Sequence, residues 1–281
     1  MTSTTVIKPE AFDIPCKDGL FIRGEVYLAE NALGSVIICH GFKGFAHWAF
    51  FPYLARTLAQ DGITAITFDF SGSGIGADRE SFSEAEAFAG NTFSRELDDL
   101  ELIEEFARRK NWITGKYGLF GHSRGGGVAI LFAASEAANV SSLVTWAAIS
   151  FPNRWSPEDV ITWRKRGYAE ITNSRTGQVM SLGTDLLDDV ELNGKTKLNI
   201  AAAAGKVKAP WLIIHGTGDE TVPSSEAEHL HSQSKGMSTL RLIEGANHAF
   251  SAVHPLGQVP PVLEKVVLET AKFFVRNATM K

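Results

Sequence analysis

Ser123 is the residue whose surroundings most clearly predict chemistry. It lies at the centre of the pentapeptide Gly-His-Ser-Arg-Gly at 121–125, after the apolar run 117–120 and at the start of a helical, alanine-rich stretch at 123–137. A serine on a sharp strand-to-helix turn projects its hydroxyl above the sheet, and flanking glycines let the helix pack close to the strand. This context predicts a nucleophile, with a serine that only caps its helix as the alternative.

A serine hydroxyl becomes a good nucleophile when a base removes its proton and a third group orients that base. Asp219 and His248 are the candidates, because each follows a predicted strand, at 211–215 and at 240–243, through a short loop. Parallel strands end at the same edge of a sheet, so we expect both side chains beside Ser123. The chain order serine, acid, histidine is one in which such triads occur.

Each partner of the serine has a competitor nearby in the sequence. Asp219 would also cap the helix that follows it, and Glu220 is an adjacent acid. His254 competes with His248, but it lies farther from its strand and directly before a proline. Three further histidines are predicted to lie at the surface or on helices, and no pair of them has the arrangement of a metal site: His47, His229 and His231.

Two backbone N–H groups are expected to bind the oxyanion that forms when a serine attacks an acyl carbon. One is that of Arg124, directly after the nucleophile. The other is that of Phe42, in the glycine-containing loop 40–44 after the strand 35–39. An ordinary glycine turn is the alternative reading of that loop.

The segment 69–74, Asp-Phe-Ser-Gly-Ser-Gly, superficially resembles a phosphate-binding loop. It lacks the lysine and the immediate helix that such a loop requires, so we interpret it as a structural turn.

Short apolar runs alternate with amphipathic helices along most of the chain, which predicts a mainly parallel α/β sheet with helices on both faces. An entry hairpin at 12–16 and 20–28 is expected to be antiparallel. The helix before Ser123 is expected to begin at a Ser94 cap and end near Arg109. The other expected strands are 35–39, 64–68, 117–120, 143–149, 211–215 and 240–243, and the other expected helices are 50–60, 225–234 and 262–277.

The alternation stops between residues 151 and 207, and we interpret this segment as a cap inserted into a single domain spanning 1–281. A helix at 159–166 and a hairpin of 168–172 and 178–182, joined by an Asn-Ser-Arg-Thr-Gly turn, are predicted within it. Residues expected to contact substrate are Trp155, Trp163, Tyr168, His40 and His122, with Arg154, Arg164 and Lys165 available for a carboxylate or phenolic oxygen. The same aromatic residues would alternatively form a small core of the cap.

Composition and charge are those of an ordinary globular protein. The chain has 281 residues, 44% of them hydrophobic, and a net charge of −5, which argues against nucleic acid or an anionic membrane as the main partner. The N-terminus has no signal-peptide character and no apolar stretch is long enough to span a membrane, so we expect a cytoplasmic protein. Exposed cap aromatics permit a homodimer without requiring one. Cys16 and Cys39 are interpreted as small hydrophobic residues.

Several motifs together resemble the α/β-hydrolase superfamily over nearly the whole chain outside 151–207. Within it, the chain is most similar to small bacterial carboxylesterases of the cinnamoyl- or feruloyl-esterase type and to dienelactone-hydrolase-like enzymes. The resemblance implies an eight-stranded, mostly parallel sheet, a Ser-His-Asp triad and no cofactor. The motifs are His40-Gly41-Phe42, Asp69 with Gly72 and Gly74, the run 121–126, His215-Gly216 with Asp219, Val222 and Pro223, and Asn247-His248.

Departures from related families narrow the chemistry. Dienelactone hydrolases have cysteine where this chain has Ser123, and haloalkane dehalogenases and epoxide hydrolases have aspartate there. Prolyl-oligopeptidase relatives carry a propeller for which the chain has no room. Arg124 is not the commonest residue after the nucleophile, and its side chain either forms a local salt bridge or binds an anionic end of the substrate.

These observations predict a serine hydrolase that cleaves carboxylic esters of small acyl or hydroxycinnamoyl acids. A thioesterase or a small peptidase would use the same residues. A ligand-binding protein on a hydrolase fold is the alternative from a different class, and a cofactor-free oxygenase or lyase has no motif in its favour.

Overall fold

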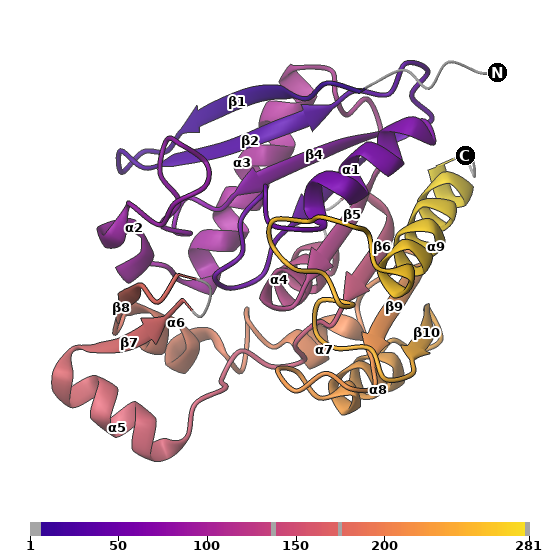
Figure 1. The fold of residues 1–281 in the computed structure, drawn as a ribbon. Helices are drawn as coiled ribbons and strands as arrows, with labels where there is room; N and C mark the ends of the chain where they lie inside the picture. The colour runs from indigo at the N-terminus through magenta and orange to yellow at the C-terminus, as the bar shows by residue number, and fades with distance from the viewer. Residues whose placement is uncertain (1–6, 136–138, 174–175, 279–281) are drawn as a thin grey trace.

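A computed structural model describes residues 7–135, 139–173 and 176–278. Its main sheet has eight strands in the order β1-β2-β4-β3-β5-β6-β9-β10 (Figure 1). β2 pairs antiparallel with β1 and β4, and the remaining neighbours pair in parallel. The predicted, mostly parallel sheet with an antiparallel entry hairpin is therefore confirmed. The strands are β1 Glu10–Pro15, β2 Phe21–Tyr27, β3 Gly34–Cys39, β4 Ile63–Asp69, β5 Tyr117–His122, β6 Val140–Trp146, β9 Trp211–Gly216 and β10 Ser238–Ile243.

Helices cover both faces of this sheet and form a separate hydrophobic core on each. One core contains side chains from α1 and α9, and the other contains side chains from α3, α4, α7 and α8. The central strands β3, β4 and β5 are almost wholly buried, as expected for parallel strands between two helical layers. The helices are α1 Phe51–Gln60, α3 Phe93–Arg109, α4 Arg124–Ala133, α7 Ile200–Ala204, α8 Ser224–Gln233 and α9 Pro261–Ala278.

The start of α3 differs from the prediction. Thr92, and not Ser94, caps the helix, because Thr92 has extended backbone and its side chain accepts a hydrogen bond from the Arg95 amide. Ser94 lies inside the first turn, where its amide and hydroxyl donate to Asp189 at 2.9 and 2.6 Å. A second polar residue near the expected boundary misled the sequence interpretation.

Other helix and strand boundaries also differ from the predicted ones. The strand expected at 143–149 is β6, at Val140–Trp146, and α4 ends at Ala133, although residues 136–138 of the expected helix lie outside the described structure. The predicted loop between β4 and α3 contains the short helix α2, Ala85–Ala89, which has too few residues to show a clear apolar period.

The segment between β6 and β9 carries secondary structure of its own. α5, Pro157–Arg166, and the antiparallel pair β7, Tyr168–Thr172, and β8, Val179–Gly183, agree with the prediction, and residues 174 and 175 of the expected turn lie outside the described structure. α6, Asp185–Asn193, and α7 were not anticipated. Figure 1 shows α5 projecting from the body of the molecule, with β7 and β8 nearer to it.

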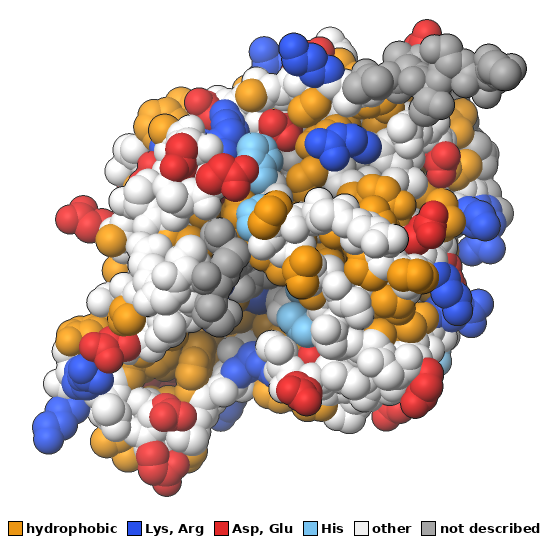
Figure 2. Space-filling view, viewed as in Figure 1, with side chains coloured by type: hydrophobic (Ala, Val, Ile, Leu, Met, Phe, Trp, Pro, Cys, Tyr) orange, Lys and Arg blue, Asp and Glu red, His pale blue; other side chains and the backbone are white. Residues whose placement is uncertain are grey.

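None of the helices in the described ranges combines the length and apolar character that crossing a bilayer requires. Figure 2 shows acidic and basic side chains interspersed over the face it presents.

Candidate active site

Ser123 occupies a strained turn between β5 and α4. Its φ of 56° and ψ of −122° are unusual for a residue with a side chain, and such strain occurs where a functional group must be held in place. The Ser123 carbonyl accepts hydrogen bonds from the amides of Gly126 and Gly127, which fixes the turn to the helix. The side chain makes no helix-capping hydrogen bond, which leaves the hydroxyl available for chemistry.

Glycine is required on both sides of the serine. A Cβ on Gly121 would approach the Gly125 carbonyl oxygen to 2.3 Å, and a Cβ on Gly125 would approach the His40 carbonyl oxygen to 2.2 Å. Because these obstacles are backbone atoms, the turn accepts no side chain at either position without moving α4 away from β3 and β5.

Asp219 and His248 meet where β9 and β10 end. His248 Nδ1 lies 2.7 Å from Asp219 Oδ2, and the other carboxylate oxygen accepts the amides of Thr221 and Val222 at 2.9 Å. Burial would raise the pKa of Asp219, but hydrogen bonds from His215, His248 and the Val222 amide outweigh it and hold the pKa well below its usual range. The carboxylate is therefore charged, and its bond to Nδ1 fixes the orientation of the His248 ring.

The competing histidine, His254, lines the same pocket as His248 but has other partners. Glu220 is exposed. His254 accepts a hydrogen bond from the Ala49 amide through Nδ1 and lies 3.8 Å from Glu80.

His215 is a supporting residue that the sequence interpretation did not assign. Its ring is fully buried, and Nε2 lies 2.8 Å from the Val222 carbonyl and 3.2 Å from Asp219 Oδ2. One N–H thus supports both the acid and the turn that carries it. Its position on β9, four residues before Asp219, was the signal available in the sequence.

His122 packs against the ring of His248. Its Nε2 donates to the His248 carbonyl at 3.0 Å, and the two rings lie 4.7 Å apart. Burial and the nearby His248 lower the pKa of His122 to about 3, so the ring is neutral and supports His248 without competing for its proton.

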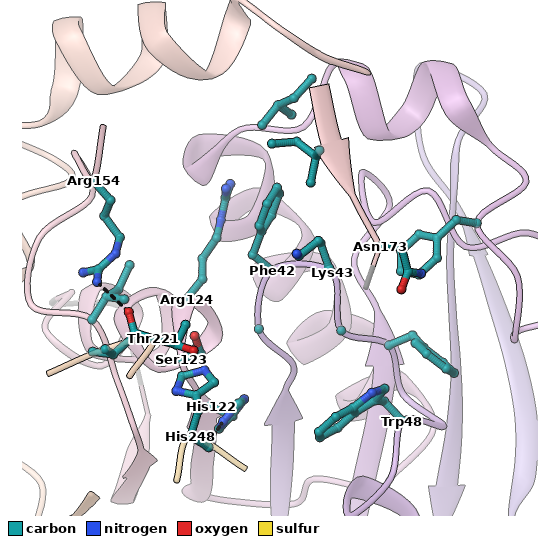
Figure 3. Close-up of a pocket in the computed structure, with 18 of the residues that line it drawn as sticks. Phe42, Lys43, Trp48, His122, Ser123, Arg124, Arg154, Asn173, Thr221 and His248 are labelled. Carbon is teal, nitrogen blue, oxygen red and sulfur yellow. Dashed lines mark hydrogen bonds between the residues drawn. The ribbon is translucent and has the colours of Figure 1, made fainter. Parts of the chain in front are cut away.

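The two residues whose amides are predicted to bind an oxyanion, Phe42 and Arg124, both lie near Ser123 in the pocket (Figure 3). Neither the Phe42 nor the Arg124 amide donates a hydrogen bond to another described residue. A Cβ on Gly41 would lie 2.9 Å from Ser123 Cβ, which shows how closely the loop after β3 approaches the serine. Both amides are therefore available as donors, and the loop that carries Phe42 packs against the serine.

Asp69 and His40 hold that loop from behind. Asp69 Oδ1 accepts the Ala46 amide at 2.6 Å, and burial raises the pKa of this carboxyl to about 7. His40 accepts the Phe70 amide at Nε2, so its Nδ1 donates to the Gly41 carbonyl at 2.8 Å. Burial lowers the pKa of His40 to about 4. The His40 ring therefore braces the loop.

A pocket of about 670 Å³ opens above the serine. Ser123, His122 and His248 lie at one side of it (Figure 3). The segment between β6 and β9 contributes Trp155 and Leu182 to its lining. Most of its lining is apolar or aromatic, including Phe42, Phe45, Trp48, Phe51, Phe82, Phe93, Ile149 and Leu186.

The residues expected to contact substrate fall into two groups. Trp155 and His122 line the pocket, whereas Trp163, Tyr168 and His40 are not among its lining residues. Trp163 is buried and packs edge-on against Trp155 at 5.1 Å, and both belong to the large core that contains α3 and α4, so the predicted small core of the cap is not separate from it. Tyr168 is exposed on β7.

The cationic residues divide in the same way. Arg154 lines the pocket and pairs with Glu226 at 2.7 Å. Arg164 instead pairs with Asp188 and Glu191 on the outer surface.

The Arg124 side chain forms the local salt bridge that the sequence allowed. Its Nε donates to Glu96 Oε2 at 3.0 Å, and its guanidinium lies 4.0 Å from the centre of the Phe93 ring. Arg124 and Glu96 are both buried, and Arg124 also lines the pocket.

Within 7–135, 139–173 and 176–278, no cluster of three histidine, cysteine or acidic side chains is arranged to hold a metal ion. Cys39 is buried, Cys16 is partly buried, and both are free thiols.

Comparison with known proteins agrees with this architecture. A family model described as serine aminopeptidase, S33, matches residues 30–185, which is more than half of the chain. The uncharacterized protein YqkD of Bacillus subtilis is 22% identical over 254 residues, covering 86% of this chain and 73% of YqkD.

Solved structures share the fold over nearly the full length. Est1E from Butyrivibrio proteoclasticus with ferulic acid bound has a TM-score of 0.72 at 21% identity, covering 95% of this chain and 98% of Est1E. The acylaminoacyl peptidase of Pyrococcus horikoshii has a TM-score of 0.70 at 18% identity, covering 98% of this chain and 42% of the peptidase. The predicted α/β-hydrolase fold is thus confirmed.

Proposed function

The chain belongs to the serine aminopeptidase S33 family of α/β-hydrolases, and from this membership we propose that it hydrolyses carboxylic esters through Ser123, His248 and Asp219. The observation that carries the proposal is the 2.7 Å contact between His248 and the charged Asp219, at the same pocket as the strained serine.

In this mechanism His248 Nε2 removes the proton from Ser123 as the hydroxyl oxygen attacks the acyl carbon. Asp219 holds Nδ1–H of His248 and stabilises the imidazolium that forms. The proton then passes to the leaving alcohol, which gives an acyl-enzyme. Water, activated by the same histidine, attacks the acyl-enzyme and releases the acid.

The amides of Phe42 and Arg124 would stabilise each tetrahedral intermediate. Loss of one such donor typically costs about 10²–10³ in kcat. Residues 151–207 would act as a cap that supplies one wall of the pocket and excludes water.

The charge of the pocket supports esters over substrates with a free amino terminus. Its lining contains Lys43, Arg124 and Arg154, and no carboxylate side chain occurs among the described lining residues. An aminopeptidase must bind a free ammonium group, and the acids that pair with Arg124 and Arg154 do not line the pocket, so no described lining carboxylate is available for it. Neutral or oxygen-rich acyl groups match the charge of this pocket better than an acyl group with a free ammonium does.

The aromatic lining supports an acyl group with apolar surface. Est1E, which shares the fold, has been solved with ferulic acid, and this makes hydroxycinnamoyl esters a reasonable part of the substrate panel.

The test compares wild type with Ser123→Ala on nitrophenyl esters of short, long and hydroxycinnamoyl acids, beside thioester and aminoacyl amide substrates. We expect Ser123→Ala to lower kcat for esters by at least about 10⁴-fold, because the serine acts as a unit with its base. Ser225→Ala, at an exposed position of α8, is the matched control and should retain activity.

A fluorophosphonate probe gives an independent readout, since it reacts with activated serines. Labelling of wild type and not of Ser123→Ala is the expected result. Unchanged ester hydrolysis in Ser123→Ala would contradict the mechanism, and an unlabelled, inactive wild type would favour a ligand-binding protein.

A further inference from the structure

Arg124 is a buried cation that uses little of its hydrogen-bonding capacity. A guanidinium has five N–H donors, and here Nε alone is engaged, by Glu96 at 3.0 Å. Nη2 is buried without a partner, and neither Nη nitrogen donates to any residue within the described structure. The side chain as a whole is only 6% exposed. A buried donor without a partner is destabilising and calls for an explanation.

The guanidinium is also held in a fixed orientation. It stacks over Phe93 at 4.0 Å and lies 5.5 Å from the Phe42 ring. Glu96 is fixed in turn by Asn91, whose amide donates to the other carboxylate oxygen at 2.8 Å. The Nη edge therefore cannot rotate freely to find another partner.

The position of this group connects it to the serine. Figure 3 shows the Arg124 side chain extending away from Ser123 and alongside Phe42 in the pocket. The amides of Phe42 and Arg124 would hold the substrate carbonyl, and the side chains of the same two residues line the pocket beside the serine.

The other cations of the pocket are already engaged or exposed. Arg154 donates to Glu226 and reaches the Thr221 carbonyl. Lys43 is exposed and donates to the Thr172 carbonyl. Arg124 is the buried member of the three that retains donors for a ligand.

We propose that the Nη edge of Arg124 binds an oxygen acceptor, preferentially a carboxylate, at the far end of the acyl group, and that this makes Arg124 a specificity-determining residue. The inference rests on the proposed ester hydrolysis at Ser123. A guanidinium N–H donates a charge-assisted hydrogen bond to a carboxylate, which a methyl end cannot accept and a neutral ether oxygen accepts more weakly.

The experiment compares kcat/KM for three esters whose acyl groups each have six main-chain atoms: 4-nitrophenyl hexanoate, 4-nitrophenyl 4-methoxybutanoate and mono-4-nitrophenyl adipate, each corrected for spontaneous hydrolysis. We expect wild type to prefer the adipate over the hexanoate by about 10-fold or more, with the methoxy ester between them. A hexanoate ester that carries the carboxylate on its phenol tests the leaving-group side.

The variant is Arg124→Gln combined with Glu96→Gln, because removal of the arginine alone would leave a buried, uncompensated carboxylate. The adipate-to-hexanoate ratio should fall to about one in this double variant, and Arg124→Lys should give an intermediate ratio. The matched control, Arg154→Gln with Glu226→Gln, removes an ion pair on another wall and should keep the wild-type ratio.

Equal rates for adipate and hexanoate in wild type, or a ratio that survives in the double variant, would overturn the inference while ester hydrolysis stands. A preference for the carboxylate on the phenol would overturn the acyl assignment. Calorimetry of monomethyl adipate and methyl hexanoate with the Ser123→Ala protein measures the site without turnover. Tighter binding of monomethyl adipate than of methyl hexanoate would support the Arg124 site even if the protein does not hydrolyse esters. Equal binding of the two would reject the site.

Discussion

At the scale of single residues, the carboxylate of Asp219 is the point at which several segments meet. It accepts the His248 ring, the buried His215 ring and the amides of Thr221 and Val222. Because both oxygens are engaged, the carboxylate has one orientation, and His248 inherits that orientation through Nδ1.

Asp219→Asn tests this role. The amide can present its NH₂ group to His248 Nδ1, which favours the wrong tautomer of the imidazole, so kcat for esters should fall by about 10⁴-fold while the fold is retained. Steady-state kinetics together with a melting curve check the result. A variant that kept more than a tenth of wild-type kcat would contradict the assignment of the acid.

His215 is expected to act through Asp219 as a positioning residue. His215→Leu removes the donor and should lower kcat by about 10–100-fold, the range expected for a hydrogen bond to a charged group, with little change in KM. His215→Gln, which retains an N–H donor, should recover part of the loss. Equal kcat in the two variants would indicate a packing role instead.

At the scale of elements, the turn from β5 into α4 and the end of β3 approach each other at backbone contact. The amide of Phe42 reaches the serine because Gly41 and Gly125 bring the two segments together without side chains between them. The strain at Ser123 is maintained by this packing and by the bond from the Ser123 amide to the Trp146 carbonyl.

Gly125→Ala should separate these elements. Its Cβ would meet the carbonyl oxygens of His40 and Cys39 at 2.2 and 2.7 Å, so we expect a loss of about 2 kcal/mol or more in the free energy of unfolding and a lower kcat. Urea unfolding and ester hydrolysis measure both. Gly115→Ala is the control, since its Cβ would meet nothing within 4 Å and its φ is not positive. Equal stability of the two variants would argue against a tight junction.

At the scale of the whole molecule, His47 connects distant parts of the chain. It lies 3.2 Å from Glu25 on β2 and 2.9 Å from Glu80 in the segment after β4, and Asp69 adds a more distant negative charge. The bond from Glu25, opposed by burial and assisted by Glu80, raises the pKa of His47 to about 9.

A folded-state pKa above the unfolded value of about 6.5 has a definite consequence for stability. The contribution of His47 is fully present below pH 6.5 and is lost as the pH rises through 9, amounting to at most about 3 kcal/mol. Urea unfolding between pH 6 and 9.5 should show this decline, and His47→Gln should flatten it. A wild-type profile as flat as that of the variant would be the contrary result.

The order and spacing of the chain were enough to predict the sheet and the positions of Ser123, Asp219 and His248 at its edge. Parallel strands alternate with helices in a regular pattern, and short loops keep a residue that follows a strand close to the strand's end. The helix boundaries were less predictable where two caps compete, as Thr92 and Ser94 do.

Which side chains line the pocket depends on tertiary contacts, and no local sequence pattern predicts these contacts. Trp155 and Trp163 are neighbours on one insertion, yet one lines the pocket and the other is buried behind it. From the sequence, the Arg124 side chain is equally suited to a salt bridge or to binding a ligand. Its partner, Glu96, lies on a different helix, so their contact is visible only in the folded chain. The sequence by itself determined which groups stand at the edge of the sheet, because that follows from periodicity and loop length. Tertiary structure alone decided which side chains surround the serine, because that depends on how the insertion and α3 pack against it.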